Sequence, residues 1–234
     1  MDSFLSAVHH FTAIPIPRVA AHPISAATLA WLPIVGLLAV VVTISFYIPL
    51  AAFYLPPDVA VIPGLVAICW VRGFKPEIDF CNFCDSLLGR RKRSAPRSLA
   101  GVPGITCLVF ATLLKYAIAR QFFVPESIRL LGFGTLIGFV VPMLNPKRTG
   151  AWIKILGIVW LLGSALAVFS PVKILSSADL LLALRGPTLA FALIYLCVRL
   201  TYLFADNPAP SNVAALPAEL TAYISFLLVR YHFL

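Results

Sequence analysis

The sequence predicts an all-α fold, namely a polytopic integral membrane bundle of about six to seven transmembrane helices. Composition is the first reason, because the chain of 234 residues is 61% hydrophobic and only 12% charged, with a mean hydropathy of +0.97. Soluble domains are about 45–50% apolar. The second reason is that the apolar residues form long runs separated by short polar segments. These runs fill the chain, so we expect a single membrane domain over residues 1–234. The first residues lack a charged n-region and a small-residue cleavage site, so we expect no signal peptide.

The first three runs differ in how well they fit a membrane. A spanning helix needs about 20 apolar residues, or about 17 when it is short. The run at 26–48 meets this length and is the clearest candidate. The run at 59–71 is short and predicts a partial or deeply packed helix. The run at 104–119 is the third candidate.

Four more runs follow. The run at 130–144 contains three glycines that would allow close helix contacts, namely Gly132, Gly134 and Gly138. The runs at 151–169 and 187–204 are the next candidates. The last, at 213–229, is weaker because a proline and an acidic residue interrupt it.

Basic residues predict the orientation of these runs. The loop at 72–103 carries the densest group of them, and Lys147 and Arg148 follow the fourth run. Placing both segments in the cytoplasm satisfies the positive-inside rule. Alternation then puts the N-terminus and the segment at 205–212 on the same side. We therefore expect a multi-pass protein of the cell inner membrane with its polar motifs on the cytoplasmic face.

The segment at 10–18 precedes the first run and is not expected to span. Pro15 and Pro17 forbid a continuous helix there, and its apolar residues suit an interfacial anchor. The net charge of +9 points first to topology and to membrane lipid as a partner. Nucleic acid is not an expected partner, because no basic domain lies outside the membrane runs.

The five cysteines give little functional signal. Cys81 and Cys84 form a C-x-x-C without a second ligand pair, which is weak support for zinc or redox chemistry. The other three lie in apolar runs and are expected to be small core residues: Cys69, Cys107 and Cys197.

The segment KPEIDFCNFCDSLLG, residues 75–89, is the strongest candidate for a site. If it is helical, Asp79, Asn82 and Asp85 share one broad face, and Glu77 points away from it. A basic run follows directly: Arg90, Arg91, Lys92, Arg93 and Arg97. Carboxylates beside arginines suit magnesium and a phosphate substrate. The alternative is a solvated loop whose basic residues only orient the protein.

Ionisable residues within the runs are costly and therefore informative. Lys115 and Arg199 could extend to an interface or face a phosphate or carboxylate. Glu219 lies seven residues after Asn212, so the two share a helical face. Glu219 could pair with Lys115 or with Arg199, or stay neutral, and the sequence leaves these alternatives open.

With these motifs in place, the chain resembles the cobalamin synthase family, the adenosylcobinamide-GDP ribazoletransferases, as a divergent member. The resemblance runs nearly end to end through segments that are specific in combination and order. They are FTAIPIP at 11–17, LPIVGLL at 32–38, the segment at 75–89, Gly101 and Gly104 with Lys115, and PSNVAALPAEL at 210–220. The chain departs from the family pattern at several charged positions. Lys75 replaces a histidine, Asn82 and Asn212 replace aspartates, and the arginine before Gly101 is missing.

The resemblance implies a reaction in which α-ribazole, or its 5′-phosphate, attacks adenosylcobinamide-GDP and releases GMP. It implies a transferase of a substituted phosphate group with Mg²⁺ as cofactor. Together with the residue patterns it yields three groups of candidate site residues: catalytic Lys75, Glu77 and Asp85; metal-binding Asp79, Asn82 and Asp85; and substrate-binding Arg90, Arg91, Arg93, Lys115, Asn212 and Glu219. Partners beyond substrate and lipid would be a second copy or other cobalamin-assembly enzymes.

Three other functions compete with this one. One alternative is an inactive relative that binds corrinoid or acts as a scaffold. It is favoured by the replacement of the family's histidine and aspartates at Lys75, Asn82 and Asn212. A phosphotransferase for lipid head groups is disfavoured because its D-x-x-D-G-x-x-A-R pattern is absent. A transporter would show paired polar breaks and symmetry between its halves, and the sequence shows neither.

Overall fold

The computed structural model describes residues 2–16, 24–53, 55–87, 101–145, 149–169, 177–205 and 212–233, and their regular secondary structure is entirely helical. The elements are α1 (Asp2–Phe11), α2 (Ala26–Ala30), α3 (Leu32–Ala52), α4 (Pro57–Val71), α5 (Lys75–Leu87), α6 (Val102–Ala119), α7 (Val124–Val140), a 3₁₀ turn (Val141–Leu144), α8 (Ala151–Phe169), α9 (Ser177–Phe204) and α10 (Ala215–Phe233). The predicted all-α polytopic bundle is confirmed.

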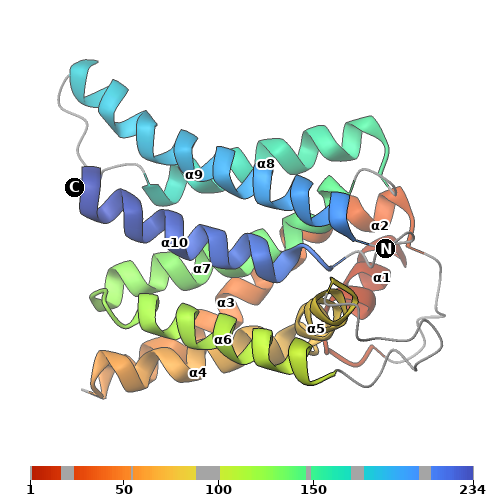
Figure 1. Ribbon diagram of the computed structural model, residues 1–234, viewed down its shortest axis with the longest axis horizontal. Helices are drawn as coiled ribbons and strands as arrows, with labels where there is room; N and C mark the ends of the chain where they lie inside the picture. Colours follow the sequence, from red (N-terminus) through yellow and green to blue (C-terminus); the bar gives the residue numbers. More distant parts are fainter. Residues whose placement is uncertain are drawn as a thin grey trace.

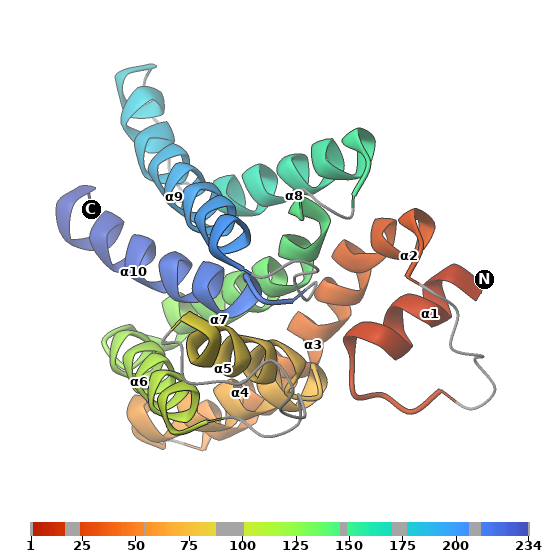
Figure 2. The ribbon, with the colours of Figure 1, turned by 45° about the vertical axis from the view of Figure 1, so that its right-hand side comes forward.

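The long helices lie roughly side by side, and the short ones gather at one end (Figure 1). α1, α2 and α5 share that end with the N-terminus, while the C-terminus lies at the other (Figures 1 and 2). Within the described ranges, five helices are long and apolar enough to cross a bilayer: α3, α6, α7 with its 3₁₀ turn, α8, and α9 from Gly186. The bent pair α4–α5 makes a sixth if it is counted as one span.

The first predicted run divides into two helices. Ser25 caps α2 in a capping box with Thr28. The chain then breaks at Trp31, and α3 begins at Leu32 with Pro33 in its first turn, where a missing N–H does no harm. The spanning helix therefore starts six residues later than the run at 26–48 predicts.

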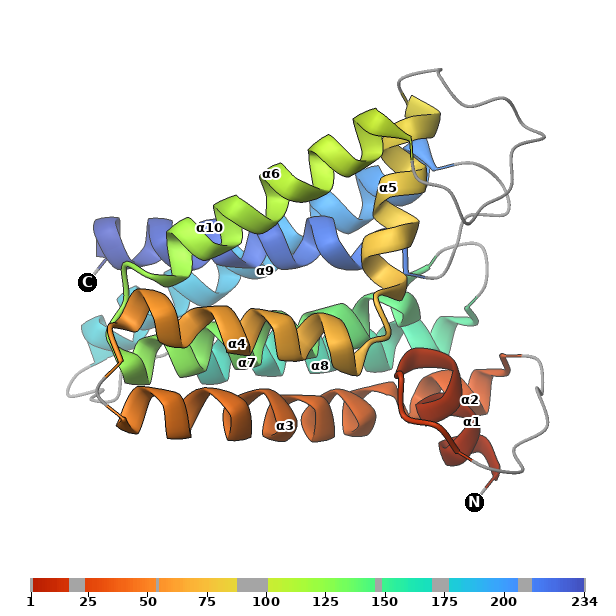
Figure 3. The ribbon, with the colours of Figure 1, turned by 90° about the horizontal axis from the view of Figure 1, so that it is seen from below.

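A sharp bend separates α4 from α5. α4 has 15 residues and meets α5 at 84°. Gly73 and Phe74 make the bend with φ of 60° and 57°, a left-handed conformation that a non-glycine residue rarely adopts. The chain after α1 braces this bend, because the Ala13 N–H donates to the Val71 carbonyl at 2.7 Å. α5 consequently stands across the end of the bundle, and much of the predicted polar loop at 72–103 is a helix (Figure 3).

α7 is the central helix. In a continuous apolar stretch of 18 residues within α7 and its 3₁₀ turn, 83% of the residues are buried, against 28–33% in the corresponding stretches of the other four spanning helices. Gly134 and Gly138 make this packing possible. A methyl group at Gly134 would lie 2.6 Å from the Tyr223 ring, and one at Gly138 would clash with Arg72 and Glu219. The predicted close helix contacts are thus confirmed at both glycines.

The outer surface of the bundle is apolar. On α3, Leu38 and Val41 are exposed, and on α6, Phe110 and Leu113 are exposed. Such side chains suit lipid, so the surface agrees with a multi-pass membrane protein. Cys69, Cys107 and Cys197, which we expected in the core, are only partly buried, whereas Cys81 and Cys84 are buried.

The packing of α5 on α6 depends on Gly104, since a methyl group there would clash with the Cys81 carbonyl oxygen. We expect Gly104→Ala to lower the free energy of unfolding by about 1–3 kcal/mol, as overpacking does. Thermal unfolding of purified protein in detergent measures the change.

The matched control is Gly163→Ala on α8, where a methyl group would meet nothing within 4 Å. It should be neutral or stabilise the protein by up to about 1 kcal/mol, because alanine is the better helix former. Equal effects of the two substitutions would contradict the close approach of α5 to α6.

Candidate functional site

A buried network of charges joins three helices in the bundle core. Glu219 of α10 accepts from Arg72 Nη1 through Oε1 and from Lys115 Nζ through Oε2, the latter at 2.7 Å. Arg72 follows α4 directly, and Lys115 lies on α6. The exposed fractions of the three residues are only 2%, 4% and 1% for Arg72, Lys115 and Glu219. Lys115 is therefore the partner of Glu219, and Arg199 instead lies on an exposed face of α9.

α7 completes this network. Arg72 Nη2 donates to the Thr135 carbonyl at 3.0 Å, and its guanidinium carbon lies 5.4 Å from the centroid of the Phe139 ring. Lys115 Nζ lies 5.7 Å from the Tyr223 ring centroid. These contacts partly replace the hydration that the buried cations lose.

Arg72 is the member that sequence reasoning missed. Arg72 begins the basic segment after a short apolar run, and a basic residue in that place usually indicates only which side of the membrane the segment lies on. Charge balance could have indicated Arg72, because an acidic residue within an apolar run, such as Glu219, needs a cation and Arg72 lies at the end of another apolar run. Gly138 is a second sign, since its missing side chain leaves room for the pair.

α5 presents two different faces. Glu77, Cys81, Cys84 and Asp85 are on its buried face, whereas Asp79 and Asn82 are half-exposed. Glu77 was expected to point away from the face of Asp79, Asn82 and Asp85. It does differ from the half-exposed Asp79 and Asn82, whereas Asp85 is buried on the same face as Glu77 and not grouped with those two. Positions eight apart on a helix differ by only about 80°, so Glu77 and Asp85 share the inward face.

Asp85 caps α6. Its Oδ1 accepts from the Gly104 N–H at 2.8 Å, and its Oδ2 accepts from the Gly101 N–H at 2.5 Å. A carboxylate at this position satisfies N–H groups that the first turn of a helix leaves unpaired. Its negative charge also interacts favourably with the positive N-terminal end of the helix dipole. The pairing explains why Gly101 and Gly104 face the acidic segment: a side chain on either would collide with Asp85.

Lys75 joins the start of α5 to the end of α1. Its ammonium group donates to three carbonyls, those of His9 at 3.3 Å, His10 at 2.7 Å and Thr12 at 3.3 Å. Partial burial lowers the pKa of this ammonium group from its ordinary value. All three donors of the ammonium are engaged, so in this structure Lys75 acts as a C-terminal cap of α1.

Glu77 is 5% exposed, and neither of its carboxylate oxygens accepts a hydrogen bond from the residues that the structure describes. It is close enough to Arg72 to interact with it electrostatically. Arg72 Nε is likewise without a hydrogen-bond acceptor in the described ranges. Two buried groups of opposite charge thus remain available to each other.

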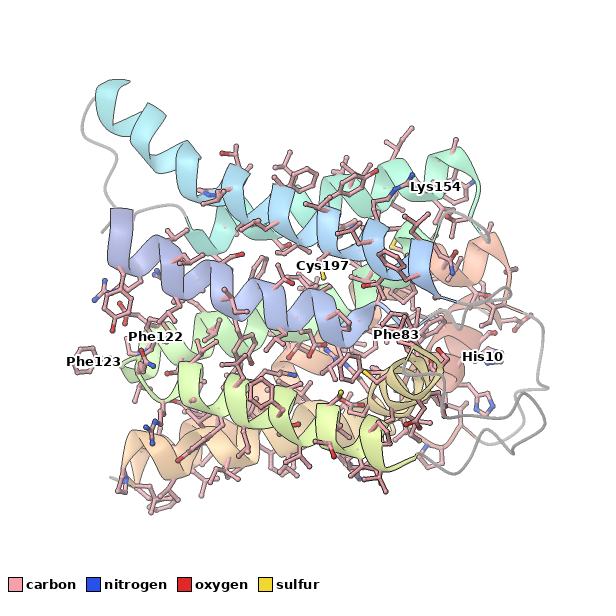
Figure 4. The ribbon with its side chains drawn as sticks, viewed as in Figure 1. His10, Phe83, Phe122, Phe123, Lys154 and Cys197 are labelled. Atoms are coloured by element: carbon pink, nitrogen blue, oxygen red, sulfur yellow. The ribbon has the colours of Figure 1, made fainter. Side chains whose placement is uncertain are left out.

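The remaining candidates are less well placed by the structure. Asn212 is 9% exposed, and its carbonyl accepts from the Ala215 N–H at the start of α10. Arg90, Arg91 and Arg93 lie outside the described residues. Figure 4 shows His10 and Phe83 at the α5 end of the bundle, and Phe122 and Phe123 at the opposite end.

The donors at this site suit Mg²⁺ only if substrate phosphates supply some of its ligands. Among the described residues, no three His, Cys, Asp or Glu side chains are grouped so that they could hold a metal ion. The oxygens of Asp79 and Asn82 are partly exposed at the end of the bundle and are of the kind that Mg²⁺ prefers. Mg²⁺ typically uses one or two carboxylates, with substrate phosphates and water completing its shell, so the donors present are compatible with it.

Comparison with known proteins identifies a family. The family model described as cobalamin-5-phosphate synthase matches residues 3–233, which is nearly the whole chain. No curated protein and no solved structure shows significant similarity to the chain.

Loss of the Glu219 charge should be the most damaging single change in the core. Glu219→Gln removes the carboxylate that is paired with both Arg72 and Lys115, so we expect a loss of about 3–5 kcal/mol in the free energy of unfolding. Thermal unfolding in detergent should show a lower midpoint.

Glu126→Gln is the matched control for this change. It removes a carboxylate from the pair with Arg230, in which the side chains are 24% and 42% exposed. Surface pairs contribute about 0–1 kcal/mol, so this variant should unfold like the wild type. Equal destabilisation by the two variants would contradict a special role for the buried network.

Lys75→Met tests the cap. Without the ammonium donors the end of α1 should fray, so amide hydrogen exchange within residues 2–13 should accelerate while α7 remains protected. Unchanged exchange in α1 would show that the three carbonyls do not depend on Lys75.

Proposed function

The chain belongs to the cobalamin-5-phosphate synthase family, a family of cobalamin biosynthesis enzymes, and on that premise we propose that it joins adenosylcobinamide-GDP to α-ribazole or its 5′-phosphate. The products are adenosylcobalamin, or its phosphate, and GMP. The family match over residues 3–233 is the observation that carries the proposal. The helix α5, with its carboxylates at one end of an apolar bundle, is where we locate the chemistry.

The proposed step is a transfer at a pyrophosphate. A ribose hydroxyl of the ribazole attacks the phosphorus that is bonded to the cobinamide. The bond between that phosphorus and the bridging oxygen breaks, GMP leaves with the bridging oxygen, and the hydroxyl proton is released. Such a reaction depends on positioning and charge neutralisation more than on covalent help from the protein.

Asp79 and Asn82 are the residues that we assign to magnesium, because they are the half-exposed oxygen donors of α5. Bound Mg²⁺ would supply positive charge at the pyrophosphate. Arg90, Arg91 and Arg93 follow in sequence and are our candidates for holding the phosphates through paired N–H groups.

The other candidate residues take supporting roles in this proposal. Lys75 and Asp85 already hold α5 to α1 and α6. Lys115 and Glu219 are paired in the core, which favours shaping the bundle over direct contact with substrate. The apolar bundle suits a large substrate that partitions into the membrane interface, and we place the reaction on the cytoplasmic face of the cell inner membrane.

The test is GMP release by purified protein in nanodiscs containing adenosylcobinamide-GDP and α-ribazole, with and without Mg²⁺. We expect Mg²⁺-dependent release. In Asp79→Asn the Mg²⁺ requirement should rise by about 10–100-fold, as for loss of a metal ligand or its support. Glu126→Gln, at an exposed pair on α7, is the control and should behave as wild type.

Two results would contradict the proposal. Corrinoid binding without GMP release would make the chain a binding relative that has lost the chemistry. Neither binding nor release would leave the family match as evidence of ancestry only.

A further inference from the structure

The acidic helix α5 is attached to the bundle near both of its ends. At its start, Lys75 donates to carbonyls at the end of α1, and near its end Asp85 accepts from the first turn of α6. Between these two attachments Glu77 is on the buried face of α5 and interacts electrostatically with Arg72. Glu77 is thus a buried acidic residue of α5 whose carboxylate accepts no hydrogen bond from the described residues.

The geometry of Arg72 suits a double role. A guanidinium presents several N–H donors in a rigid plane and can therefore serve two carboxylates at once. One edge of Arg72 is taken by Glu219 and the Thr135 carbonyl. Its Nε and both oxygens of Glu77 have no hydrogen-bond partner among the described residues, although the two groups interact electrostatically.

We propose that Arg72 is a positioning residue, shared between Glu219 in the core and Glu77 on α5. Through Glu77 it sets the orientation of α5, and hence of the half-exposed Asp79 and Asn82 on the other side of that helix. A buried carboxylate without compensation is costly, so the attraction to Arg72 is what keeps this face of α5 turned inward. The burial of both residues and their unpartnered polar atoms support the link, whereas its effect on turnover rests on the proposed function.

Thiol reactivity measures the position of α5 without relying on activity. Cys81 and Cys84 lie on the same buried face as Glu77, with exposed fractions of 3% and 8%. In Glu77→Gln and in Arg72→Lys this face should open more often, so alkylation of both cysteines by N-ethylmaleimide should accelerate by about tenfold. Cys197 on α9 is the internal reference, and its rate should not change.

A double variant separates a direct link from two independent effects. Because both substitutions break the same interaction, Arg72→Lys/Glu77→Gln should alkylate no faster than the single variants. Additive acceleration, or acceleration at Cys197 as large as at Cys81, would overturn the proposal in favour of general loosening. If Arg72→Lys does not fold, Glu77→Gln alone still decides, because unchanged alkylation of Cys81 and Cys84 overturns the link.

The activity measurement then tests positioning. In Glu77→Gln the Mg²⁺ concentration that gives half-maximal GMP release should rise by about tenfold, because Asp79 and Asn82 are no longer held in position. A fall in kcat with an unchanged Mg²⁺ requirement would overturn a positioning role. If wild-type protein releases no GMP, the proposed function fails, whereas the alkylation rates still decide whether Arg72 and Glu77 are linked.

Discussion

The structure depends on one buried carboxylate that serves two cations. Glu219 brings α10 to Arg72 at the end of α4 and to Lys115 on α6, and the backbone of α7 accepts a further bond from Arg72. These groups are costly to desolvate, so they hold the helices in one arrangement only when all are present. The packing of α7 accommodates these groups. The helix has glycine at 134 and 138, where Tyr223 and the charged network occupy the space that a side chain would need.

The same arrangement turns the acidic helix toward the end of the bundle. The left-handed bend at Gly73 and Phe74 follows Arg72 directly, so the residue that anchors α4 in the core also determines where α5 begins. Lys75 then donates to backbone carbonyls at the end of α1, and Asp85 accepts from backbone N–H groups at the start of α6. Asp79 and Asn82 are the acidic and amide side chains of α5 that are partly exposed, which is why the proposed metal chemistry is assigned to them.

The helical class, the apolar runs and the family were predictable because they depend on composition, run length and motif order. The boundaries at Trp31 and at Gly73 were harder, since they depend on local backbone conformation within apolar sequence. The sequence left the partner of Glu219 open between Lys115 and Arg199, and only packing decides it. Arg72 was missed because a basic residue at the end of a run is typical of topology. Asp85 was grouped with Asp79 and Asn82 because helical phase alone does not say which face is buried.

The most direct test of the central network is a double-mutant cycle between Lys115→Met and Glu219→Met, with the free energy of unfolding measured in detergent for all four proteins. The two residues form an ion pair at 2.7 Å in the core, so we expect each single variant to be strongly destabilised and the coupling energy to be at least about 1 kcal/mol. A coupling energy of zero, with the two effects simply additive, would show that Lys115 and Glu219 do not interact and would contradict this account of the fold.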